Sequence, residues 1–127
     1  MFNHVMVGSN DVDGARRFYD AVLGALGFSP SSVPGIAAYP SDGGNFVVVS
    51  PSNGEPACHA NGGTIGFRAT SYAQVDAFHA AGLANGGACG GAPGFRESSP
   101  GRKYGAYLRD PDGNKICAFA PRSDRDP

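Results

Sequence analysis

The sequence FNHVMVGSNDVDGARRFYDAVLGALGF, residues 2–28, decides the fold, because its pattern returns as GGTIGFRATSYAQVDAFHAAGLANGG, residues 62–87. His4 and Thr64 hold the same place in the two copies, 60 residues apart. From each of them the side chains alternate as they do along a half-buried strand. The chain is therefore predicted to contain two copies of one structural unit.

A helix is predicted to follow each of these strands. Asp11 and Ser71 are also 60 residues apart, and both are residue types that cap the start of a helix. Gly27 and Gly87 stand where a helix end favours a left-handed residue. Between these signals, apolar residues recur at helical spacing and predict a face packed on a core. They are Val12, Ala15, Phe18, Val22 and Leu26 in the first copy, and Tyr72, Val75, Phe78 and Leu83 in the second.

The two halves also end alike, this time 70 residues apart. Residues 41–45 are a turn sequence followed by a short apolar run, and residues 111–115 repeat that order. The ten-residue difference falls in the Gly/Pro/Ser-rich segment 90–101. We therefore predict one domain over residues 1–127, made of two βαβββ modules. Their approximate limits are 1–54 and 62–120, with a linker over 51–61 and a charged tail over 121–127.

The composition is that of one small domain without a strong charge. Of 127 residues, 41% are hydrophobic, which suffices for a packed core. Ten basic and eleven acidic residues give a net charge of −1, so we expect neither nucleic acid nor a membrane as partner. The apolar runs are too short to span a bilayer, and residues 1–17 are too polar for a signal peptide. Three cysteines at unpatterned spacing imply no disulfide framework and favour the cytoplasm.

The fold class expected from the repeat is α+β, with a curved mixed sheet, helices outside and a cup inside. A helix covers one face of each module's sheet, so the other faces must close on each other. Side chains alternate between the two faces of a strand. Those expected under the helices are Val5, Val7, Ile65, Phe67, Ile116 and Ala118. Those expected in the cup are His4, Met6, Thr64, Gly66, Arg68, Lys115 and Cys117. Polar residues gather in the cup, where a ligand site belongs.

Together with YLRDPDGNKICAF, residues 107–119, these stretches resemble the vicinal oxygen chelate superfamily of glyoxalases, bleomycin-resistance proteins and extradiol dioxygenases. The most specific piece is Arg109–Asn114, and the resemblance extends from residue 2 to about 120. It implies paired βαβββ modules and a small-molecule ligand. It favours a glyoxalase-like enzyme (a lyase, isomerase or dioxygenase relative) acting on a small anionic or oxygenated metabolite. The alternative is a non-catalytic protein of bleomycin-resistance type that sequesters its ligand.

In metal-using members of the superfamily, the ligands occupy inward positions on the first and last strand of each module. The matching residues here are His4, Val47, Thr64 and Cys117. A catalytic divalent cation needs about three nitrogen or oxygen ligands from the protein, and only His4 is of the usual kind. We therefore expect no tightly held metal and no other cofactor. If a metal did bind, His4 would be its first ligand.

His4 and Cys117 are the candidate catalytic residues, because a thiol and an imidazole facing each other can form a thiolate–imidazolium pair. Two further roles stay open for His4: a hydrogen-bonded strand residue, or a ligand of a soft metal shared with Thr64 and Cys117. Cys117 alone is also typical of a small buried hydrophobe. No chemistry is expected of Cys58 and His59 in the linker, or of His79, which matches Tyr19 in the repeat.

The polar segment 95–104 is either a solvated loop or a flap over the cup. Arginines in and near it can donate paired hydrogen bonds to a carboxylate or a phosphate. The predicted ligand-binding residues are Thr64, Arg68, Arg96, Arg102, Tyr104 and Tyr107. A second copy of the chain is the other expected partner, because small open sheets leave edges and two-fold dimers are the commonest oligomers.

Overall fold

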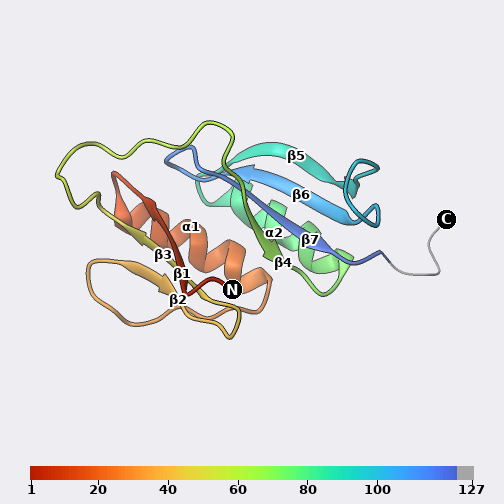
Figure 1. Ribbon diagram of the computed structural model, residues 1–127, viewed down its shortest axis with the longest axis horizontal. Helices are drawn as coiled ribbons and strands as arrows, with labels where there is room; N and C mark the ends of the chain where they lie inside the picture. Colours follow the sequence, from red (N-terminus) through yellow and green to blue (C-terminus); the bar gives the residue numbers. More distant parts are fainter. Residues whose placement is uncertain (123–127) are drawn as a thin grey trace.

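The computed structural model describes residues 1–122. The order strand, helix, further strands occurs twice along the chain (Figure 1). The first module contains β1 (His4–Gly8), α1 (Val12–Ala25), β2 (Ala37–Tyr39) and β3 (Asn45–Val49). The second contains β4 (Ile65–Arg68), α2 (Tyr72–Ala84), β5 (Ala88–Phe95), β6 (Tyr104–Arg109) and β7 (Lys115–Ala120). Of the predicted tail 121–127, residues 123–127 lie outside the described residues.

The strands form two mixed sheets, one per module, in the orders β1-β3-β2 and β4-β7-β6-β5. In both sheets the first strand of the module runs parallel to the last, and the other pairs are antiparallel. This confirms the predicted α+β class and its repeated modules. Within the described residues the first module has one strand fewer, because Pro30, Pro34 and the positive-φ Gly35 occupy the segment before β2. Proline has no N–H to donate to a sheet.

The register of the parallel strands confirms the repeat residue by residue. Met6 lies opposite Val47 in the first sheet, and Gly66 lies opposite Cys117 in the second. The positions predicted under the helices are buried or partly buried. The residues predicted in the cup divide between the two sheets. His4 and Met6 share a face of the first sheet, whereas Gly66, Arg68, Lys115 and Cys117 share a face of the second, and Thr64 directly precedes β4.

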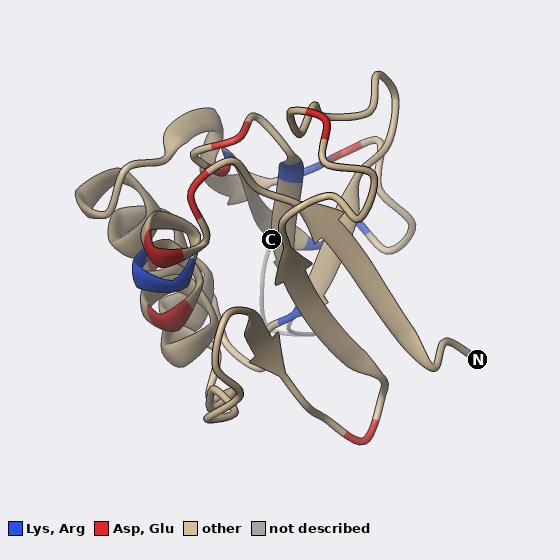
Figure 2. Ribbon diagram, turned by 90° about the vertical axis from the view of Figure 1, so that its left-hand side faces the viewer, with Lys and Arg blue, Asp and Glu red and all other residues tan. Residues whose placement is uncertain are grey.

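Each helix begins at its predicted cap and buries most of its predicted face. Asp11 accepts a hydrogen bond from the Gly14 N–H at 3.1 Å, and Ser71 accepts one from the Gln74 N–H at 3.1 Å. The two helices pack against each other and lie on one side of the strands (Figure 2). Figure 2 also shows both acidic and basic residues on α1, in keeping with a net charge of −1.

The prediction that Leu83 packs in the core is wrong, since 48% of its surface is exposed. Helix α2 instead turns Gly82 toward the core, where a Cβ would lie 2.4 Å from a methyl carbon of Leu108. The bare glycine lets α2 approach β6 closely, and the buried face continues through Val75, Phe78 and His79. Leu83 follows Gly82 by one residue and therefore points outward.

The turn between β6 and β7 joins the two modules through one buried carboxylate. Asp110 is 4% exposed, and its Oδ2 accepts the Tyr19 hydroxyl of α1 at 2.6 Å and the Asn114 Nδ2 at 2.8 Å. Its Oδ1 accepts the backbone N–H groups of Asp112 and Asn114, both at 2.9 Å. Burial, followed by the charge and hydrogen bond of Asp110, raises the pKa of Tyr19 well above its usual value. The most specific stretch of the sequence thus has a structural role.

Candidate functional site

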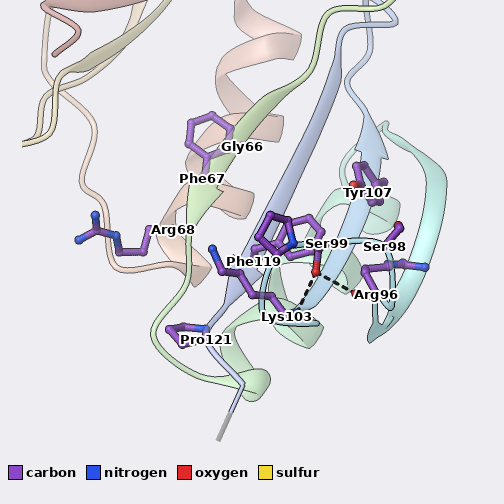
Figure 3. Close-up of a pocket in the computed structure, with 11 residues that line it drawn as sticks. Gly66, Phe67, Arg68, Arg96, Ser98, Ser99, Lys103, Tyr107, Phe119 and Pro121 are labelled. Atoms are coloured by element: carbon purple, nitrogen blue, oxygen red, sulfur yellow. Dashed lines mark hydrogen bonds between the residues drawn. The ribbon is translucent and has the colours of Figure 1, made fainter.

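A pocket of about 790 Å³ opens on the face of the second sheet that α2 does not cover (Figure 3). Strands β4, β6 and β7 supply its floor, because alternate residues of each point away from α2. The segment between β5 and β6 forms its wall. The lining residues are Gly66, Phe67, Arg68, Arg96, Ser98, Ser99, Pro100, Lys103, Tyr107, Phe119 and Pro121.

The pocket is cationic. Arg68, Arg96 and Lys103 line it, and its lining includes no acidic side chain. Figure 3 shows Lys103 and Arg96 on the side of the β5–β6 segment, whereas the Arg68 side chain extends away from the others.

The Arg96 guanidinium is held by backbone carbonyls beside it and still has an unpaired N–H donor. Its Nη2 donates to the carbonyl of Ala92 and to that of Gly105, the latter at 3.3 Å. Its Cζ lies 5.5 Å from the centroid of the Tyr107 ring, a cation–π arrangement. Its Nε is buried and has no hydrogen-bond partner in the described part of the chain. An unpaired buried donor of this kind costs about 1–3 kcal/mol.

The segment that carries Arg96 is a closed turn. The Arg96 N–H donates to the Lys103 carbonyl at 2.9 Å, and the Lys103 N–H donates to Ser99 Oγ at 2.8 Å. Arg102 adopts a left-handed conformation with a φ of 48° and forms a surface ion pair with Glu97 at 3.4 Å. It does not line the pocket. Of the two arginines predicted in this segment, the structure brings only Arg96 to the pocket.

Tyr104 lies on the opposite face of the sheet, beside α2. Its hydroxyl donates to Asp76 Oδ1 at 2.6 Å, and this hydrogen bond is the main reason that the pKa of Tyr104 is raised. Its ring contacts those of Tyr72 and Phe95, with centroids 4.6 and 5.2 Å away. The structure thus brings the predicted residues Arg68, Arg96 and Tyr107 to one pocket. Thr64, Arg102 and Tyr104 are not among its lining residues.

His4 and Cys117, the predicted catalytic pair, belong to different sheets and do not line this pocket. His4 is exposed, and its Nδ1 lies 2.7 Å from Asn3 Oδ1. Cys117 is buried, and burial raises the pKa of its thiol to about 11, against a smaller opposing effect of Lys115. Cys117 is therefore protonated at neutral pH. The sequence pattern does not reveal that the strands divide between two sheets and so place these residues in different ones.

The donor set does not fit the metal centre that the superfamily resemblance implies. Val47 offers no donor atom, and His4 lies in a different sheet from Cys117. Within residues 1–122, no group of three or more His, Cys, Asp or Glu side chains is placed to hold a metal ion.

Neither described helix is long and apolar enough to cross a membrane.

Sequence reasoning missed several lining residues. Phe119 has the same strand parity as Cys117, so the alternation rule would have found it. Ser98, Ser99 and Lys103 depend on how the turn folds, and no periodic pattern marks them. A cysteine–histidine pair also escaped prediction, since His79 Nε2 lies 3.2 Å from Cys89 Sγ.

The fold and pocket define an α+β protein of two repeated modules with a cationic pocket on its second sheet. Residues 1–118 match the family model of the Glyoxalase/Bleomycin resistance protein/Dioxygenase superfamily, and the chain belongs to that superfamily. A glyoxalase/bleomycin resistance protein from Albidiferax ferrireducens is 54% identical. The match covers 94% of this chain and 98% of that one, with a TM-score of 0.89.

More distant solved structures share the fold alone. A glyoxalase-related enzyme from Fulvimarina pelagi is 18% identical, with a TM-score of 0.72 over 92% of this chain and 85% of that one. A lactoylglutathione lyase from Agrobacterium tumefaciens is 23% identical, with a TM-score of 0.61 over 92% and 90%. No curated protein matches the sequence at a significant level.

Proposed function

We propose that the protein binds a small organic anion in the pocket on the open face of β4-β7-β6-β5. The observation that carries the proposal is the Arg96 guanidinium, which lines the pocket with a buried Nε that has no partner in residues 1–122. A carboxylate oxygen is the natural acceptor for such a donor, because charge-assisted hydrogen bonds to arginine are strong. Lys103 adds a second positive charge to the lining of the pocket.

The floor of the pocket supports an anion with a flat apolar portion. Tyr107 and Phe119 stand edge to face, with ring centroids 5.7 Å apart, and both are partly exposed to the pocket. Aromatic rings of this kind favour stacked or edge-on contact with another unsaturated group. An aromatic or unsaturated carboxylate would place its charge at Arg96 and its body over these rings.

Binding without chemistry has more support than glyoxalase-like catalysis by His4 and Cys117. The two side chains lie in different sheets, and the raised pKa of Cys117, about 11, opposes a thiolate. The geometry therefore favours ligand sequestration, the alternative drawn from bleomycin-resistance proteins.

A thermal-shift series with matched probes tests the proposal. Benzoate and phenylacetate should raise the unfolding temperature, whereas benzamide and phenylacetamide, which lack the charge, should not. The variant Arg96→Gln should abolish the shift, while Arg102→Gln, which changes the surface arginine of the same turn, should keep it. An equal response to acids and amides, or an unchanged response in Arg96→Gln, would overturn the proposal.

We also propose that the chain pairs with a second copy. Strands β1 and β4 each end a sheet with one unpaired edge, and Met6 on β1 is 52% exposed. Exposed edges and apolar side chains favour self-association. Sedimentation at tens of micromolar should give a dimer, and a monomer under these conditions would contradict the proposal.

A further inference from the structure

A thiol and an imidazole meet on the face of the second sheet opposite the pocket. Cys89 lies on the edge strand β5 opposite Leu108, so its side chain points toward α2. There the Sγ of Cys89 lies 3.2 Å from Nε2 of His79. Cys89 is exposed, whereas His79 is only 9% exposed. The pair thus joins an exposed cysteine to a histidine that is largely buried.

The imidazole is suited to accept the thiol proton. Burial lowers the pKa of His79, against a smaller opposing effect of Asp76, so the ring is neutral near pH 7. A neutral imidazole has one nitrogen free to accept, and Nε2 faces the sulfur. In the tautomer that carries its proton on Nδ1, Nε2 accepts the thiol proton in an S–H···N hydrogen bond, which is the geometry of a thiol with an adjacent general base.

The surroundings leave the sulfur open to a reagent. Gly90 and Gly91 follow Cys89 and have no side chains to shield it, and the pairing of β5 with β6 is irregular between Cys89 and Gly91. Strand β5 is the outermost strand of its sheet, so no further strand covers it.

The other two thiols lack this combination. Cys117 is buried, and the pKa of its thiol is raised to about 11. Cys58 is exposed in the linker, and within residues 1–122 its thiol forms no hydrogen bond to a histidine. Cys58 therefore serves as a matched control for exposure without a base.

We propose that Cys89, with His79 as its base, is a modification site that forms mixed disulfides with low-molecular-weight disulfides. His79 Nε2 takes the thiol proton while Sγ attacks one sulfur of the disulfide. The new S–S bond forms as the old one breaks, and the departing thiolate receives the proton from Nε2. The Cys89 sulfur is oxidised and the departing half is reduced to a thiol, so no other reactant is needed.

The test uses 4,4′-dithiodipyridine, a neutral disulfide whose released thiol absorbs light. At substoichiometric reagent and pH 7, peptide mapping of the wild-type protein should find most of the label on Cys89. A base in contact with the thiol should make Cys89 react at least about tenfold faster than Cys58. The variant Cys89→Ser should lose the fast phase, and Cys58→Ser should keep it. Label that appears first or equally on Cys58 would overturn the proposal.

The variant His79→Gln tests the base directly. In this variant the labelling rate of Cys89 should fall to that of Cys58, while the labelling rate of Cys58 stays the same. Continued protection of the buried Cys117 reports that the variant is folded. If Cys89 keeps its rate in a folded variant, the proposal fails. If Cys117 becomes reactive, the variant has unfolded, and the distribution of label in the wild-type protein decides the question.

Discussion

Replacing Asp110 by asparagine removes the charge of the buried carboxylate and keeps its shape. The four donors that Asp110 accepts come from the Tyr19 hydroxyl, the Asn114 side chain and two backbone N–H groups of the turn. An amide has only one oxygen, so its NH₂ group faces two of these donors whichever way it turns. Two charge-assisted hydrogen bonds are therefore lost, each worth about 1.5–3 kcal/mol.

The Tyr19 hydroxyl can rotate to accept from the new amide, which recovers part of this loss. We expect Asp110→Asn to lower the free energy of unfolding by about 2–4 kcal/mol, a large share of the stability of a small domain. In urea the unfolding midpoint should fall by roughly 1–2 M. Tyr19→Phe removes one of the four bonds and should cost less.

The double variant should show that the two residues act together. Because Tyr19 and Asp110 share a hydrogen bond of 2.6 Å, their combined cost should fall short of the sum of the single costs. Glu55→Gln, at an exposed position, is the control and should stay within about 0.5 kcal/mol of wild type. A loss below about 1 kcal/mol in Asp110→Asn would refute the reasoning.

Three further predictions concern a pair of glycines, a cysteine and a histidine. Gly87→Ala should destabilise the protein by about 1–3 kcal/mol, because its Cβ would lie 2.4 Å from the Phe18 ring and 2.9 Å from backbone oxygens. Gly24→Ala, with no atom within 4 Å of the added Cβ, should stabilise α1 by about 0.5–1 kcal/mol; urea denaturation measures both. Iodoacetamide at pH 8 should alkylate Cys117 on the order of a hundredfold more slowly than a free thiol, because its pKa is raised to about 11; equal rates by peptide mapping would contradict this. The pKa of His79 is lowered in the folded state from the usual 6.5, so the unfolded chain takes up the proton first. Stability should therefore be full above pH 6.5 and fall below it, and a flat profile from pH 7.5 to 5.5 in urea would rule this out.

The repeated elements were accessible to sequence analysis because local chemistry specifies them. The caps Asp11 and Ser71 and the alternating strands follow from hydrogen bonding and side-chain parity, which act over a few residues. The placement of His4 and Cys117 in different sheets was not accessible, because it depends on how the strands divide between two sheets. The outward position of Leu83 likewise depends on the contact of Gly82 with β6.

The pocket was predictable only in part, for a related reason. Arg68 and Tyr107 lie on strands, where parity decides which face a side chain takes. Arg96 and Arg102 are the same residue type six positions apart, and composition does not separate them. The left-handed backbone at Arg102 and the bonds through Ser99 send one arginine to Glu97 and the other to the pocket. Such turn geometry is set by the fold around it.

The longer second module has a practical consequence for anyone who wishes to change what the protein recognises. The residues that make it longer than the first lie between α2 and β6, in strand β5 and in the segment that forms the wall of the pocket, outside the core cluster. Surface segments tolerate changes in length at small entropic cost. Libraries that vary residues 97–101 in length and sequence would therefore retune selectivity while both helices and their shared core stay as they are. The duplicated scaffold thus keeps stability in one set of residues and leaves another set free to adapt.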